Sequence, residues 1–224
     1  MIRRTCVLFI SLAMLLTRSS AADADSSKVS QALIIGFELS GPVIFSLDEN
    51  ILNLEGYLAY RLTDKYYAVF EPGYSSYKYS QYNYEYNSEG FFLRVGLDIN
   101  LIKPKNGPVK HFAGFGLRYG ISLSSQETPW FAYENYWGRN ESILEPESFH
   151  AHFLEAGGGV KAEVFNNIYM GWSVKLRLMF YSSAGQHNKP AYIPGVGTTG
   201  TTVRPALSYY LAWQLPFKFK GTRK

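Results

Sequence analysis

Residues 91–100 read Phe-Phe-Leu-Arg-Val-Gly-Leu-Asp-Ile-Asn, with an apolar side chain at every second position. In a β-strand, successive side chains point to opposite faces of the sheet. One face of this stretch is therefore entirely apolar, from Phe91 to Ile99. The other face holds Arg94, Gly96 and Asp98. The pattern predicts a strand with an apolar face and a face of small and charged residues.

The same alternation recurs along the chain, and no helical periodicity stands out. We expect eight strands, at residues 32–40, 53–61, 66–77, 91–100, 111–122, 148–165, 168–181 and 202–219. Thirteen charges fall on the face opposite the apolar one: Glu38, Glu55, Arg61, Glu71, Arg94, Asp98, Arg118, Glu155, Lys161, Glu163, Lys175, Arg177 and Arg204. The apolar face carries no Asp, Glu, Lys or Arg in any of these strands. The two faces therefore belong to two different environments.

The connections between the expected strands alternate strictly in length. The first, third, fifth and seventh have about 12, 12, 24 and 20 residues, and the others have about 4, 10 and 2. The tightest is Asn166-Asn167, a pair that tolerates the positive φ of a two-residue hairpin turn. Short turns on one side and long loops on the other are typical of outer-membrane barrels.

The first residues predict export. Arg3 and Arg4 precede an 11-residue, mostly apolar run, and small residues follow at 20–24, as in a cleaved signal peptide. We expect a leader at 1–22, a short periplasmic segment at 23–31, the barrel at 32–219 and a periplasmic tail at 220–224. The only cysteine, Cys6, leaves with the leader, which excludes disulfides and cysteine metal sites in the mature protein.

The composition excludes several classes of protein. Of the 224 residues, 17% are aromatic and only 18% are charged, which argues against a disordered, charge-rich chain. The mean hydropathy of −0.13 argues against a polytopic helical membrane protein. Loss of three leader arginines lowers the basic count from 22 to 19 against 18 acids, so the net charge falls from +4 to +1. The charge therefore gives no support to nucleic-acid binding.

These features together predict an all-β fold, an eight-stranded antiparallel up-and-down transmembrane β-barrel. It would be a monomer in the outer membrane of a Gram-negative bacterium, with lipid against its apolar face and both termini in the periplasm. The alternative is a secreted lipocalin-like ligand-binding barrel, with the apolar face turned inward around a ligand. The scarcity of charges on the supposed water face of that alternative favours the membrane barrel.

Several stretches resemble a domain-of-unknown-function family of small bacterial outer-membrane barrels. The resemblance lies in residues 92–101 (FLRVGLDINL), 116–120 (GLRYG), 154–163 (LEAGGGVKAE), 170–175 (MGWSVK) and 189–195 (KPAYIPG). They cover the chain from about the fourth strand onward, and the first three strands match in pattern only. The resemblance implies an outer-membrane location, and it supplies no activity or catalytic residues.

The interior of an eight-stranded barrel is just wide enough for side chains to fill it. Six acids and seven bases from the thirteen charges would face each other there and neutralise one another. We therefore expect a charge-plugged lumen with a structural role, and no general porin.

Candidate chemistry is sparse. His150 and His152 share one strand face with Ser148, so a lipid-modifying hydrolase using Ser148/His150 is an alternative function. The two histidines alone lack the further ligands of a metal site. We expect no enzyme activity, no cofactor and no metal.

The long loops carry many aromatic residues, which favours a surface role. The candidate binding residues are Tyr77, Tyr79, Tyr82, Tyr84, Tyr86, Trp130 and Trp137. Most of the tyrosines have a spacing of two, so the third and fourth strands could extend beyond the bilayer as a hairpin with a tyrosine face. The loops would bind an extracellular protein, peptide or glycan, or would cap the barrel and serve envelope structure.

Overall fold

The computed structural model describes residues 32–102, 111–185 and 189–215. The expected leader at 1–22, the segment at 23–31, the tail at 220–224 and the last residues of the eighth expected strand, 216–219, lie outside these ranges.

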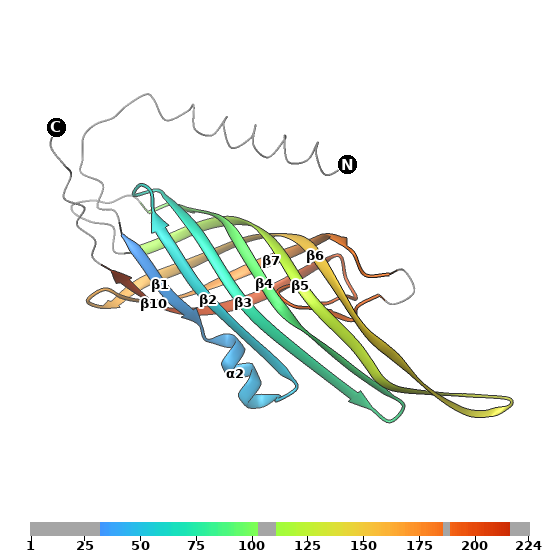
Figure 1. Ribbon diagram of the computed structural model, residues 1–224. Helices are drawn as coiled ribbons and strands as arrows, with labels where there is room; N and C mark the ends of the chain where they lie inside the picture. Colours follow the sequence, from blue (N-terminus) through green and yellow to red (C-terminus); the bar gives the residue numbers. More distant parts are fainter. Residues whose placement is uncertain (1–31, 103–110, 186–188, 216–224) are drawn as a thin grey trace, which may run out of the picture.

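The described chain forms a closed barrel of eight antiparallel strands (Figure 1). The strands are β1 (Leu33–Glu38), β2 (Ile51–Arg61), β3 (Tyr66–Gln81), β4 (Tyr84–Asn100), β5 (His111–Asn135), β6 (Gly138–Phe165), β7 (Ile168–Ser182) and β10 (Val203–Leu215). Each strand pairs with its neighbour in sequence, and the ring closes where Leu33 of β1 lies opposite Leu215 of β10. The predicted eight-stranded up-and-down barrel is confirmed.

The two ends of the barrel differ. One end, called the turn end here, carries the turns at 62–65 and 166–167, and β1 starts and β10 stops there. The opposite hairpin end carries the β3–β4 and β5–β6 hairpins and the described residues between β7 and β10, 183–185 and 189–202 (Figure 1). Asn167 has a φ of 64°, the positive value that its two-residue turn demands.

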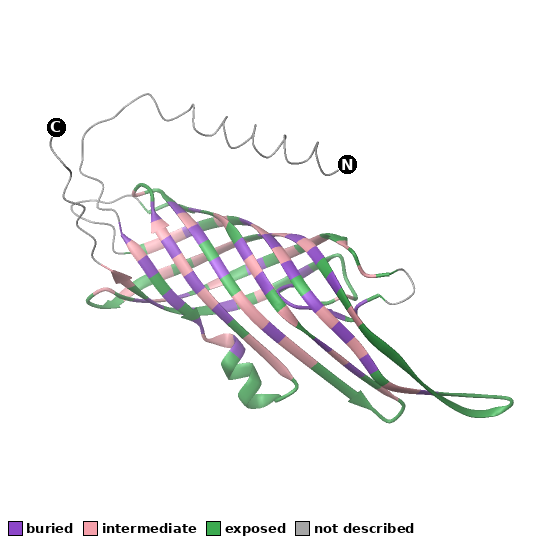
Figure 2. Ribbon diagram, in the orientation of Figure 1, coloured by how far each residue is buried: buried purple, intermediate pink, exposed green. Residues whose placement is uncertain are grey.

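The apolar face of the strands points outward. Phe115, Leu117 and Leu207 are 60–68% exposed on this surface, and exposed and buried residues alternate along each strand (Figure 2). A lipocalin-like barrel would bury this face around a ligand, so that alternative is wrong. Among the described residues, no helix is long and apolar enough to cross a bilayer.

Two connections expected as long loops continue as paired strands, and for the third connection the tyrosine spacing predicted this extension. β3 continues to Gln81 and β4 starts at Tyr84, which leaves a two-residue turn and forms the extended tyrosine hairpin. The fifth connection, expected as a loop of about 24 residues, is a hairpin with a two-residue turn between Asn135 and Gly138. β-Branched and aromatic residues around Phe131 and Ile143 favour strand, and pairing satisfies their backbone groups. β6 has 28 residues, whereas about 9–11 cross a bilayer.

A short helix, α2 (Ser40–Leu47), follows β1 at the hairpin end, although the sequence showed no helical periodicity. The carboxylate of Glu38 accepts hydrogen bonds from the backbone N–H groups of Ser40 and Gly41, each at 2.9 Å, which satisfies two free donors of the first turn. Gly41 lies against β2, because a Cβ at this residue would lie 1.9 Å from the carbonyl oxygen of Asn53. Eight residues are too few for a visible 3.6-residue period.

Candidate functional site

The lumen is filled by an ion-pair cluster. Its members are the acids Glu55, Glu71, Asp98 and Glu155 and the bases Arg94, Arg118, Lys161, Lys175 and Arg177. They come from β2 to β7, because period-2 geometry turns every second residue of these strands inward. Most are almost fully buried.

Arg94 lies at the centre of the cluster, and its side chain is 0% exposed. Its guanidinium pairs with Glu55, with Glu71 at 3.2 Å and with Glu155 at 2.6 Å. Lys175 links Glu71 at 3.2 Å to Glu155 at 3.3 Å. Glu55 also pairs with Arg177, and Asp98 pairs with Arg118 and Lys161, so each acid of the cluster meets more than one base. Charge-assisted contacts therefore close the waist of the barrel.

The other four of the thirteen predicted inward charges lie toward the ends of the barrel. Glu38 holds the start of α2, and Arg204 donates to the carbonyl oxygen of Thr201 at 2.6 Å, both toward the hairpin end. Near the turn end, Arg61 donates to Gln214 at 3.3 Å and Glu163 accepts from the backbone of Asn167 at 2.9 Å.

A second seal closes the hairpin end of the lumen. Residues 190–199 of the loop between β7 and β10 form a small hairpin, which we call the plug, with the paired strands β8 (Tyr192–Ile193) and β9 (Gly197–Thr198). Ile193 is 0% exposed and Val196 is 2% exposed, and both belong to one buried apolar cluster with Phe149 and Phe153 from β6. Apolar packing thus covers the lumen above the ion pairs.

Tyrosines hold the plug in place. The Tyr86 hydroxyl accepts the backbone N–H groups of Ala191 at 3.2 Å and Tyr192 at 3.4 Å. The Tyr192 hydroxyl forms a 2.6 Å hydrogen bond with Ser75, and burial raises the pKa of this phenol. Gly195 has a φ of +76° and touches Phe92, where a Cβ would lie 2.5 Å from the ring. Only glycine fits this close approach with that backbone.

The predicted surface aromatics divide into two groups. Tyr86 is 3% exposed, so its ring belongs to the plug contact and is unavailable to an outside partner. Tyr77 stacks on Tyr192, Tyr84 and Trp130 are half-buried, and Tyr79 is 37% exposed. Tyr82 and Trp137, at the hairpin tips, are 87% and 88% exposed.

Tyr136, an aromatic residue of the same expected loop that was not selected as a candidate, is 94% exposed beside Trp137. It lies in the two-residue turn between the paired strands β5 and β6. Tyr82, Tyr136 and Trp137 are called the tip aromatics below.

Ser148 and His150 lie on the outer face of β6, in an open groove that Glu89 also lines. No hydrogen bond joins Ser148 to His150 among the described residues, and no carboxylate there pairs with the His150 ring. The ring instead lies 5.6 Å from His152 and 5.7 Å from Tyr181, between centroids. The geometry shows no assembled nucleophile–base–acid triad. No cluster of three or more metal-binding side chains occurs in the described chain.

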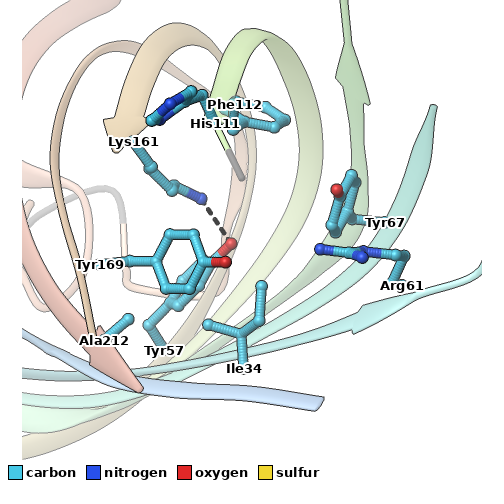
Figure 3. A pocket seen from close by; sticks show the side chains of 9 residues that line it. All are labelled: Ile34, Tyr57, Arg61, Tyr67, His111, Phe112, Lys161, Tyr169 and Ala212. Atoms are coloured by element: carbon cyan, nitrogen blue, oxygen red, sulfur yellow. Dashed lines mark hydrogen bonds between the residues drawn. The ribbon is translucent and has the colours of Figure 1, made fainter. Parts of the chain in front are cut away.

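A cup opens at the turn end of the lumen (Figure 3). It is lined by Ile34, Tyr57, Arg61, Tyr67, His111, Phe112, Lys161, Tyr169 and Ala212. The polar ends of Tyr57, Lys161, Tyr169 and Arg61 point toward its centre, and Tyr67 and Phe112 form aromatic walls (Figure 3). Sequence alone did not indicate this site, because its residues come from seven strands.

The sequence itself identifies the family. Residues 1–220 match the family described as a domain of unknown function, DUF6048. The chain belongs to this family. No curated protein matches it.

Three solved barrels are similar in fold. They are the N-terminal β-barrel domain of Pseudomonas aeruginosa OprF, Neisserial surface protein A (NspA) and Acinetobacter baumannii CarO. Their sequence identities are 10%, 13% and 8%, and their TM-scores are 0.31, 0.35 and 0.38. The alignments cover 84%, 84% and 83% of this chain and 98%, 95% and 97% of those chains, respectively.

Proposed function

We propose that the protein is a monomeric barrel of the outer membrane whose sealed lumen serves as a scaffold for a binding surface outside the cell. The outward apolar belt supports the membrane location, because it would be costly to expose to water. Bacterial barrels keep short turns in the periplasm, so the turn end would face inward and the hairpin end outward.

The observation that carries the surface role is the exposure of the tip aromatics. Three large rings, each more than four-fifths exposed, lie on two hairpins that extend far beyond the membrane belt. Tyr and Trp provide contact area with little side-chain entropy to lose on binding. An extracellular protein, peptide or glycan would dock on them, while the lumen provides no passage.

Photo-crosslinking on intact cells tests the surface role. A benzophenone amino acid replaces Trp137, and a matched control carries it at Leu47, which is 84% exposed on α2 at the same end. We expect a discrete crosslinked partner from position 137 and none from position 47. Adding Tyr82→Ser and Tyr136→Ser should weaken capture strongly, because hot-spot aromatics typically cost about 2 kcal/mol or more when truncated.

A second candidate role is purely structural, with the hairpins contributing to envelope integrity. The tie between the hairpins, where Arg139 lies over the rings of Tyr82 and Trp130, favours it. If the folded protein gives no crosslink at position 137, the binding role is wrong. Increased detergent sensitivity of cells that lack the protein would then support the structural role.

A further inference from the structure

The outer parts of the two long hairpins differ in charge from the rest of the chain. Residues 78–90 and 124–148 contain seven acids and two bases, which are Glu85, Glu89, Glu127, Glu134, Glu141, Glu145 and Glu147 against Lys78 and Arg139. The rest of the chain from residue 23 onward contains 11 acids and 17 bases. The hairpins that extend furthest from the barrel (Figure 1) are therefore negative, so they attract a cationic partner and repel an anionic one.

Three of these acids share one face of the hairpins with an arginine and aromatic rings. Glu85 lies opposite Trp130 where β4 pairs with β5. Glu134 lies opposite Arg139 near the turn between β5 and β6. Residues directly opposite in an antiparallel pair point to the same face, as do alternate residues of one strand. We call this surface the Arg139 face, and its members are Tyr82, Glu85, Trp130, Glu134, Arg139 and Glu141.

The Arg139 face already holds one guanidinium. The guanidinium carbon of Arg139 lies 5.6 Å from the ring centroid of Tyr82 and 5.8 Å from that of Trp130. Its Nε lies 3.3 Å from a carboxylate oxygen of Glu141. Aromatic rings and carboxylates are the groups that bind a guanidinium well, through cation–π contacts and charge-assisted hydrogen bonds. This contact within the chain shows which chemistry the surface accommodates.

The same surface has further carboxylates and rings that hold no cation. Glu85 and Glu134 are exposed, and neither forms an ion pair within the ranges that the structure describes. In the turn after Glu134, Tyr136 and Trp137 pack edge to face with ring centroids 5.3 Å apart, and they are 94% and 88% exposed. A second arginine, supplied from outside, would find the same kinds of partner that Arg139 has. A neutral glycan would use the rings and leave these carboxylates unused.

We propose that the Arg139 face and the adjoining tip aromatics bind a cationic polypeptide segment that presents arginine side chains. The proposal rests on the proposed surface role and specifies its partner. Incoming guanidinium groups pair with Glu85 and Glu134 and lie over the exposed rings of Tyr136 and Trp137. The negative hairpins speed the encounter with such a segment, because opposite charges steer association.

Fluorescence polarisation on the full chain, folded in detergent, tests this proposal. The probe is a labelled peptide of four Gly-Arg repeats, and its control carries citrulline, which has nearly the same shape as arginine and no charge. We expect saturable binding of the arginine peptide, about tenfold tighter than that of the citrulline peptide. Added salt should weaken the binding, because it screens exposed charges.

Variants of the protein locate the binding on this face. Glu85→Gln together with Glu134→Gln removes two carboxylates of the face and should weaken binding about tenfold. The matched control is Asp48→Asn with Glu49→Gln, which removes two exposed carboxylates just after α2 at the same end and should change binding less than about twofold. Tyr136→Leu keeps an apolar side chain, removes one ring face and should weaken binding about threefold.

Three results would overturn the proposal: no saturable binding of the arginine peptide, equal affinity for the citrulline peptide, or equal weakening in the two double variants. Crosslinking at position 137 separates these failures from failure of the surface role. A discrete crosslinked partner without arginine-peptide binding leaves the surface role standing with a neutral partner such as a glycan. Absence of any crosslink from folded protein contradicts the surface role, and this proposal with it.

Discussion

Arg139 of the β5–β6 hairpin lies over the ring of Tyr82 at the tip of the β3–β4 hairpin, with its guanidinium carbon 5.6 Å from the ring centroid. The same guanidinium lies 5.8 Å from the Trp130 ring and pairs with Glu141 at 3.3 Å. The two hairpins are thus joined at their outer ends by a cation between aromatic faces. An exposed contact of this kind contributes about 0.5–1 kcal/mol.

Removal of this cation should free the hairpin ends without affecting the barrel. In Arg139→Gln, we expect faster hydrogen exchange at residues 131–144 and an unchanged unfolding midpoint. Lys65→Gln is the control, since Lys65 makes a similar contact with Tyr66 at the turn end. Unchanged exchange in Arg139→Gln would show that strand pairing alone holds the hairpins.

The central arginine should matter most for stability. Arg94→Met leaves the carboxylates of Glu55, Glu71 and Glu155 buried with one base fewer. Breaking a buried pair from one side typically costs about 3–5 kcal/mol, so the free energy of unfolding should fall by that amount. Urea unfolding in lipid vesicles measures it.

The control for Arg94 is Arg139→Met, whose ion pair is about half exposed and should contribute less than about 1 kcal/mol. A loss below about 1 kcal/mol in Arg94→Met would contradict the central role of this side chain. Adding Glu71→Gln to Arg94→Met should cost less than the sum of the single changes, because the two groups interact directly.

The plug and the ion pairs close the lumen at two different levels along the barrel. Replacement of residues 190–199 by a short Gly-Ser linker removes the packing of Ile193 and Val196 and should lower heat resistance. Planar-bilayer recording should still show no stable conductance, because the Arg94 cluster remains at the waist. A reproducible open channel in this variant would show that the ion pairs alone do not seal the barrel.

The outer face should respond to charge in a depth-dependent way. Val174, 47% exposed near the middle of β7, would face lipid, and Val174→Arg should cost about 2–4 kcal/mol in vesicles. Ile143→Arg is the control, because Ile143 lies on the outer part of β6 and is 66% exposed. Equal effects of both substitutions would argue against a bilayer around the strands.

Strand positions and facing followed from the sequence because alternation is a local property. Phe91 to Asn100 shows its two faces without reference to any other strand. Alternation also predicted that Arg94 and Asp98 point inward, although it could not predict which acid pairs with which base. Those pairings depend on the register between strands, such as Glu71 opposite Arg94.

The features that could not be predicted from the sequence depend on contacts between distant residues or on very short sequence signals. Ile193 is buried in a cluster with Phe149 and Phe153, which β6 brings from far along the chain. α2 begins where Glu38 satisfies two N–H groups, and its Ser-Gly-Pro start is typical of a loop. The cup around Lys161 gathers residues from Ile34 to Ala212, and no local pattern marks their meeting.

The closure of the ring through β1 and β10 has a consequence for the order of folding. Leu33 and its partner Leu215 are separated by nearly the whole described chain, so the first strand cannot complete its hydrogen bonds until the last one has been made. Contacts between residues so far apart in sequence form slowly, because a long loop must close first. Until then, one edge of β1 stays unpaired, and an unpaired strand edge is prone to aggregation. A holding chaperone or an assembly machine would bind this edge before the ring closes.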